Sequence, residues 1–110
     1  MTLGLESGYE VADLGSLTSA GVTGSQITSG VNLTFQVTVA SLGTSVTIRL
    51  EGSLDDTNYF NLDESETDTV LTADGTYGYA LNGCPVKYVR VRLVSIDGGS
   101  PTVSAKVGST

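Results

Sequence analysis

The sequence predicts an all-β protein: a single antiparallel β-sandwich, jelly-roll-like, with about seven to eight strands and an irregular N-terminal arm. Composition is the first reason, because Val, Thr, Ser, Gly and Leu dominate the 110 residues and only 15% are charged. β-branched side chains fit a pleated sheet and lose rotamer freedom in a helix. Alternation of apolar and polar residues is the second reason, and turn signals between the alternating stretches are the third.

The alternating stretches locate the expected strands. Over 31–39, Val31, Leu33 and Phe35 begin a run in which every second residue is apolar, the pattern of a half-buried strand. Asp74 and Gly75 form a turn signal before another strand, because this pair tolerates positive φ. Further turns are expected at 41–44 and 97–101. The remaining strands are expected over 46–50, 60–62, 70–71, 77–81, 87–93 and 103–107, with a further short one over 9–14.

The first thirty residues differ from the rest, so we divide the chain into an N-terminal arm or loosely packed leading segment, 1–30, and a sandwich domain, 31–110. The leading segment has no basic residue, and from 16 to 29 it is mainly small and polar. Such a stretch buries too little apolar area to offset its ordering entropy alone. Two alternatives remain: a leading strand and loop laid over the sandwich, or an arm that becomes ordered against a neighbouring subunit.

Charge restricts the partners. The net charge is −7, with five basic residues and no histidine. Nucleic-acid binding and attraction to anionic membranes both depend on Lys and Arg, so we expect no direct nucleic-acid partner and no membrane partner. Residues 1–6 lack the basic and apolar regions of a signal peptide, and no apolar run reaches the ~20 residues of a membrane span. We therefore expect synthesis in a cytosol and a soluble product.

Side chains for catalysis or metal binding are scarce, so we expect no catalytic site, no metal, no cofactor and no enzymatic activity. Without histidine, neither a His-based triad nor the usual zinc sites can form. Oxygen ligands at Asp55, Asp56, Asn58 and Asp63 would suit calcium, yet their spacing fits no EF-hand loop and a solvated turn explains them better. Cys84, the single cysteine, is expected to be buried or half-buried rather than reactive.

Three tyrosines are candidates for glycan contact. Tyr77 and Tyr79 share one face of their expected strand, and Tyr59 opens another strand. Sugars stack on exposed aromatic rings, whereas a small sandwich without Trp also needs aromatic side chains to fill its core or an interface. We favour the filling role.

Three arginines are candidates for contact with a partner. Arg49, Arg90 and Arg92 form a basic stripe if their strands pair, which suits docking on an acidic partner or another copy of the chain. The alternative is cross-strand pairing with Glu51 and its neighbours, worth about 0.2–1 kcal/mol a pair. We favour this pairing.

Two segments, 51–62 (EGSLDDTNYFNL) and 83–92 (GCPVKYVRVR), resemble small β-sandwich proteins of tailed-bacteriophage virions, many of them capsid decoration (cement) proteins or adhesin-like surface modules. The resemblance implies a structural virion protein that binds and stabilises the outer surface of a phage head by bridging capsid subunits. It implies the major capsid protein as partner, a homo-oligomer with a trimer favoured, and a place on the capsid exterior after synthesis in the host bacterial cytoplasm. The residues expected to contact the capsid or neighbouring subunits are Leu3, Leu5, Tyr9, Val11, Leu14, Leu17, Arg49, Arg90 and Arg92.

Discoidin-type sugar-binding domains offer a second resemblance. They share a Ser-x-Asp-Gly-x-x-aromatic turn, here Ser53 to Tyr59, and a Tyr-Val-Arg strand that begins here at Tyr88. Asp56 stands where those domains have Gly, and Tyr59 stands where they have Trp. The resemblance implies, as the alternative function, a carbohydrate-binding module displayed on a phage surface. Its expected glycan contacts are Tyr59, Tyr77 and Tyr79.

Overall fold

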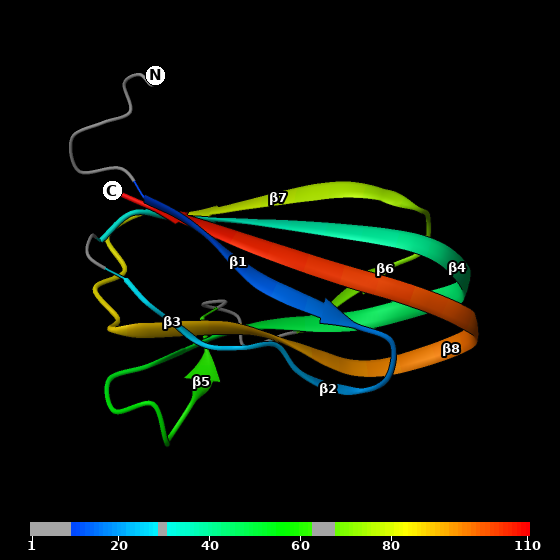
Figure 1. Cartoon of the computed structure of the whole chain (residues 1–110), viewed down its shortest axis with the longest axis horizontal. Helices are drawn as coiled ribbons and strands as arrows, with labels where there is room; N and C mark the ends of the chain where they lie inside the picture. The colour runs from blue at the N-terminus through cyan, green and yellow to red at the C-terminus, as the bar shows by residue number, and fades with distance from the viewer. Residues whose placement is uncertain (1–9, 29–30, 63–67) are drawn as a thin grey trace.

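The computed structural model describes residues 10–28, 31–62 and 68–110, and these contain eight strands and no helix (Figure 1). Every strand pairing is antiparallel. The prediction of an all-β antiparallel fold with seven to eight strands is therefore confirmed. The strands are β1 (Glu10–Leu17), β2 (Gly21–Val22), β3 (Gln26–Ile27), β4 (Leu33–Ser53), β5 (Phe60–Asn61), β6 (Thr69–Leu71), β7 (Gly75–Leu81) and β8 (Tyr88–Ser109).

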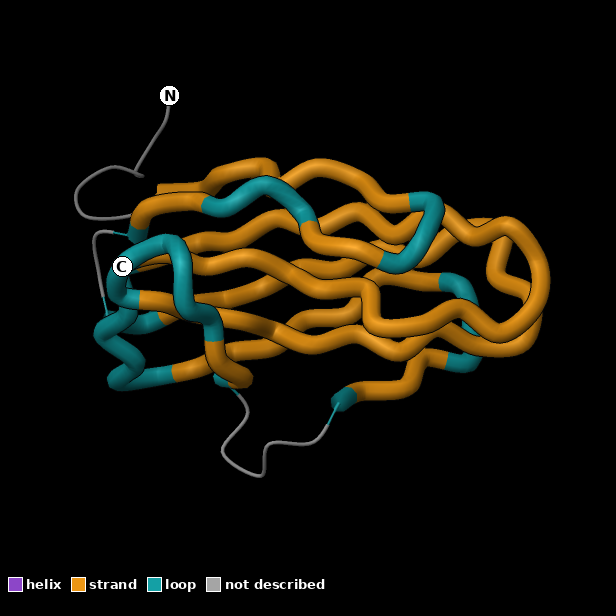
Figure 2. Tube along the Cα trace, turned by 90° about the horizontal axis from the view of Figure 1, so that it is seen from below, coloured by secondary structure: helices purple, strands orange, loops and turns teal. Residues whose placement is uncertain are grey.

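Two long strands organise the molecule. β4 has 21 residues and β8 has 22, and they pair from Leu33 with Ser109 to Ser53 with Tyr88. Both strands bend midway, so that one continuous sheet folds back on itself into two layers (Figure 2). The first layer has the order β1, second half of β8, first half of β4, β7. In the second layer, β2 and β3 pair with the first half of β8, and β5 and β6 pair with the second half of β4.

The bends occur where the sequence predicted turns between separate strands, and that part of the prediction is wrong. Ladder pairing continues through both segments, with register shifts between residues 40 and 45. Ser41 (φ 58°), Gly98 (φ 77°) and Gly99 (φ 70°) take left-handed backbone conformations there. Gly43 crosses Gly98 so closely that an added Cβ would lie 2.3 Å from its carbonyl carbon. The turn residues therefore make bulges that fold the paired strands without separating them.

The core lies between the two layers. Phe35 and Val37 on the first layer and Ile48 and Val91 on the second are fully buried. These residues alternate with exposed or half-buried ones along β4 and β8, so the predicted alternation is confirmed over 33–39, 46–48, 89–93 and 103–107. Val31 was expected to face the core as well, but it is 46% exposed because β4 begins only at Leu33.

The N-terminal strands are part of this sandwich. β1 pairs with the second half of β8, with a bulge between Asp13 and Gly15, and its Leu14 is only 5% exposed. β2 and β3 then pair with the first half of β8, so residues 10–28 pass from one layer to the other along the same side (Figure 1). Of the two alternatives for this segment, the described part follows the leading strand and loop laid over the sandwich.

Candidate binding surfaces

Four charged side chains from β4 and β8 form a cluster on the outer face of the second layer. Arg90 donates from Nε to Glu51 Oε1 at 2.7 Å, and Arg92 donates from Nε to Glu51 Oε2 at 2.9 Å. Arg49, opposite Arg92 in the ladder, lies 3.6 Å from the same carboxylate. The Glu51 side chain is only 4% exposed beneath them. The three arginines do lie side by side, as predicted. They pair across the strands with Glu51, so the favoured alternative is confirmed.

Two further contacts complete the cluster. The Arg49 guanidinium binds Asp68 through two bonds, Nε to Oδ1 at 2.8 Å and a terminal nitrogen to Oδ2 at 3.1 Å. The Tyr59 ring covers Arg90, with 3.6 Å between the guanidinium carbon and the ring centroid. Stacking on an aromatic face and bidentate pairing are the strong modes of Arg contact. The cluster therefore joins β4, β8, the residue before β6 and the residue before β5.

The contacts within the cluster shift the pKa values of Glu51, Asp68 and Arg49 in the direction that favours their charged forms. Burial raises the pKa of Glu51, but hydrogen bonds from Arg92 and Arg90 outweigh it and leave that pKa below its ordinary value. The hydrogen bond from Arg49 lowers the pKa of Asp68 and raises that of Arg49 itself. The cluster thus places three guanidinium groups against two carboxylates, Glu51 and Asp68, whose pKa values are both lowered.

The acidic turn after β4 is organised by its own backbone. Ser53 Oγ accepts hydrogen bonds from the N–H groups of Asp55 (3.1 Å) and Asp56 (3.0 Å). Asp55 Oδ1 in turn accepts from the N–H groups of Asn58 (2.8 Å) and Thr57 (3.0 Å), and these two bonds lower the pKa of Asp55. Asp56 has φ 61°, a left-handed conformation that Asp adopts more readily than most non-glycine residues. Tyr59 donates its hydroxyl proton to the Asp56 carboxylate.

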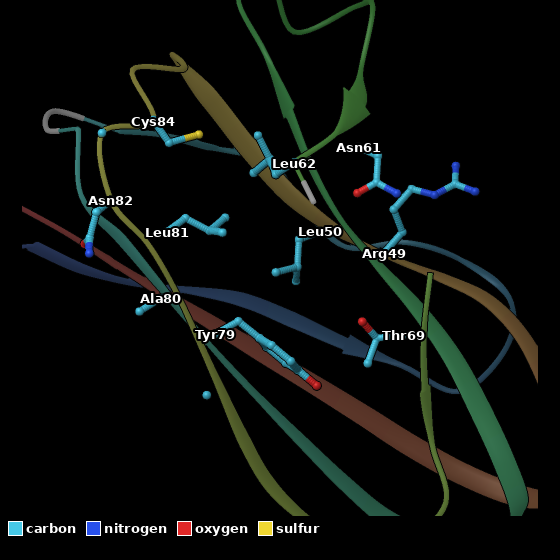
Figure 3. A pocket seen from close by; sticks show the side chains of 12 residues that line it. Arg49, Leu50, Asn61, Leu62, Thr69, Tyr79, Ala80, Leu81, Asn82 and Cys84 are labelled. Atoms are coloured by element: carbon cyan, nitrogen blue, oxygen red, sulfur yellow. The ribbon is translucent and has the colours of Figure 1, made fainter. Parts of the chain in front are cut away.

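An open groove lies between β7 of the first layer and the β5 and β6 side of the second (Figure 3). Its volume is about 700 Å³. Leu50, Leu62 and Leu81 project into the space between the two layers and make its apolar lining. The polar or ionisable lining residues are Arg49, Asn61, Thr69, Tyr79, Asn82 and Cys84. Cys84 is half-buried, as expected, and burial raises the pKa of its thiol.

The three tyrosines are not brought together. Tyr77 and Tyr79 do share one face of β7, as predicted, but this is the inner face, where both are half-buried against the core. The Tyr77 hydroxyl donates to the Ala73 carbonyl at 2.5 Å. Tyr79 lines the groove, and burial raises its pKa. Tyr59 lies on the outer face of the second layer against Arg90, so the structure favours a packing role for these rings over a shared sugar platform.

The apolar residues of the N-terminal strands differ in their exposure to solvent. Val11 is 59% exposed and Leu17 is half-buried, whereas Leu14 fills the core and is not presented to a partner. Val22 (37% exposed) and Ile27 (55% exposed), on β2 and β3, are further exposed apolar residues, and the sequence pattern did not single them out. Their only signal was an isolated apolar residue in a small polar segment. Leu3, Leu5, Tyr9 and Asp63 lie outside the described residues.

No group of three or more His, Cys, Asp or Glu side chains that could hold a metal ion occurs in 10–28, 31–62 or 68–110. Nor does this part of the chain contain a helix long and apolar enough to cross a membrane.

Comparison with known proteins shows the fold. No protein-family model matches the sequence, and no curated protein matches it. Among solved structures, the chain is similar to the SPBc2 prophage-derived protein YomS, with a TM-score of 0.57 and 15% sequence identity. The match covers 92% of this chain and 93% of that one. The two chains therefore share their fold over the matched parts.

Proposed function

We propose that this chain is a structural protein of a phage virion, which binds the outer surface of the head and bridges capsid subunits without catalysis. The observation that carries the proposal is the likeness of fold, over 92% of this chain, to a prophage-derived protein. The resemblance of segments 51–62 and 83–92 to virion β-sandwich proteins supports the same assignment. The proposed partner is the major capsid protein, and the proposed assembly is a homo-oligomer, with a trimer favoured.

The architecture suits bridging. A bridging protein needs two separate contact surfaces on a rigid body, and the first layer ends in two opposite edges, β1 and β7. On the β1 side, Val11 is exposed on the outer face of the first layer, and Val22 and Ile27 are exposed on the outer face of the second. The β7 side carries the groove. Continuous pairing of β8 and β4 joins the β1 edge to the β7 edge within one sheet.

The contact assigned to the N-terminus is tested by deletion of residues 2–9, which include Leu3, Leu5 and Tyr9. Removing all of 1–30 would take Leu14 out of the core and β1 off the sheet, so only the shorter deletion separates binding from folding. We expect the deletion to weaken cosedimentation with purified phage heads at least tenfold while thermal unfolding stays within a few degrees of wild type. Unchanged cosedimentation would remove the N-terminal contact from the proposal.

A glycan-binding role has one supporting observation, the position of Tyr79 in a groove that also contains Asn61, Thr69 and Asn82. A glycan array separates the two functions. Glycan binding that is lost in Tyr79→Ala would support the carbohydrate-binding module. If the array gives no signal, the virion role is the one candidate function that remains.

A further inference from the structure

We infer that the outer edge of β7 receives an extended segment of a partner protein, which adds a strand to the first layer and places its alternate side chains in the adjoining groove. The partner segment is apolar at alternate positions and basic at its ends. Naming this partner as a capsid subunit rests on the proposed function; the binding mode itself does not.

The direction of the backbone groups on β7 follows from the ladder. Asn32 and Thr110 exchange both backbone hydrogen bonds, at 3.1 and 3.0 Å. Because hydrogen-bonded pairs alternate along an antiparallel ladder, the even residues of β4 from 34 to 38 also point their N–H and C=O groups toward β8. The odd residues of β4 therefore bond to β7, where Phe35 pairs with Tyr79 and Val37 with Tyr77.

The opposite set on β7 is consequently left facing away from the sheet. Thr76, Gly78 and Ala80 direct three N–H and three C=O groups outward, and no described residue pairs with that side of the strand. Their own side chains are small and exposed, so nothing large shields the backbone. An edge of this kind is a template for another strand.

The other edges are protected, which makes β7 unusual. β1 carries a bulge, and its Leu14 carbonyl accepts a hydrogen bond from the Gly24 N–H at 3.1 Å. The edge strands of the second layer, β2, β3, β5 and β6, have only two or three residues each. β7 has seven residues with no charge, no proline and no register shift against β4. Short strands, bulges and charges are the devices that protect sheet edges, and β7 has none of them.

The groove supplies the specificity that an edge alone lacks. In β-strand addition, main-chain hydrogen bonds give affinity and pockets for alternate side chains give selectivity. A strand added beyond β7 turns every second side chain toward the space between the layers, where Leu50, Leu62 and Leu81 line the groove. The alternate residues of the partner are therefore apolar. The net charge of −7, with Asp74 exposed at the start of β7, favours basic ends.

The test uses a labelled, end-capped synthetic peptide, KVTVTVK, titrated by fluorescence anisotropy against the full chain. Ala80→Pro removes one outward N–H without touching a bond to β4, and proline is tolerated at sheet edges. Ala80→Ser is the matched control that keeps the N–H. We expect wild type and Ala80→Ser to bind equally, Ala80→Pro to bind at least tenfold more weakly, and the peptide EVTVTVE to bind more weakly than KVTVTVK.

Amide hydrogen exchange of the wild-type chain provides a readout that needs no variant, and Gly78→Pro provides a second one if Ala80→Pro does not fold. The peptide should slow exchange at Thr76, Gly78 and Ala80 and leave β1 unchanged. Lack of binding, equal binding by Ala80→Pro, or protection elsewhere would overturn the inference. Dimerisation of wild type that Ala80→Pro abolishes would show that a second copy occupies the edge instead. Because the probe is synthetic, each of these results is independent of whether the chain is found in virions.

Discussion

Glu51 is the residue on which the outer face of the second layer depends. Its carboxylate is almost completely shielded from solvent and lies within reach of three guanidinium groups. An ion pair at the surface stabilises little, but removing one partner of a buried group leaves the others uncompensated. If the Glu51 charge is removed, Asp68 is the one described carboxylate that still forms an ion pair with these arginines. It pairs with Arg49 alone.

We therefore expect Glu51→Gln to lower the free energy of unfolding at pH 7 by about 2 kcal/mol, measured by urea denaturation. The folded-state pKa of Glu51 lies below its ordinary value of 4.5, so its stabilising contribution is complete above that pH and is lost as the pH falls through the folded pKa. The difference between wild type and Glu51→Gln should shrink accordingly in acid.

Asp13→Asn is the control for this substitution. Asp13 pairs with Lys106 at 3.7 Å, and both side chains are at least half exposed, so the change should cost less than about 0.5 kcal/mol. Equal stability of Glu51→Gln and Asp13→Asn at pH 7 would show that the cluster does not hold the layer together.

At the scale of elements, the fold depends on the bends in β4 and β8. The two strands stay paired while the sheet turns back on itself, and this requires the backbones at residues 43 and 98 to pass in close contact. A side chain at the crossing would separate the strands at the point where both layers meet.

Gly43→Ala should accordingly lower the free energy of unfolding by at least about 2 kcal/mol, because its Cβ would meet backbone atoms of Gly98 and Gly99 at 2.3–2.5 Å. Gly78→Ala is the matched substitution on β7, where no atom lies within 4 Å of the added Cβ. We expect that change to stay within about 0.5 kcal/mol of wild type. Similar unfolding midpoints in urea for the two variants would contradict the account of the bend.

Sequence reasoning succeeded where the signal was local. Alternation identified the core faces of β4 and β8 and put Arg49, Glu51, Arg90 and Arg92 on the opposite faces. That the four side chains meet was expected only if the two strands pair, as they do. It could not distinguish a turn from a bend at 41–44, since Gly and Ser allow both and only the pairing partner decides. The groove and the open edge of β7 could not be predicted either, because they depend on which distant strands pair.

The whole molecule is a bent sheet of two layers, and the two edges of its first layer, β1 and β7, have different surfaces. Exposed apolar residues lie along the N-terminal strands. Along β7 lies a groove beside a backbone edge with which no described residue pairs. Two such surfaces would suit the bridging role proposed above, and the likeness of fold to a prophage-derived protein is the main support for that proposal.

Quantitative mass spectrometry of purified virions tests that assignment most directly. The particles are those of the phage, or induced prophage, that carries this gene, purified through a density gradient. If the chain is a virion protein, it should be retained through the gradient in a fixed ratio to the major capsid protein. Its absence from particles, when it is abundant in the same infected cells, would rule out the virion role.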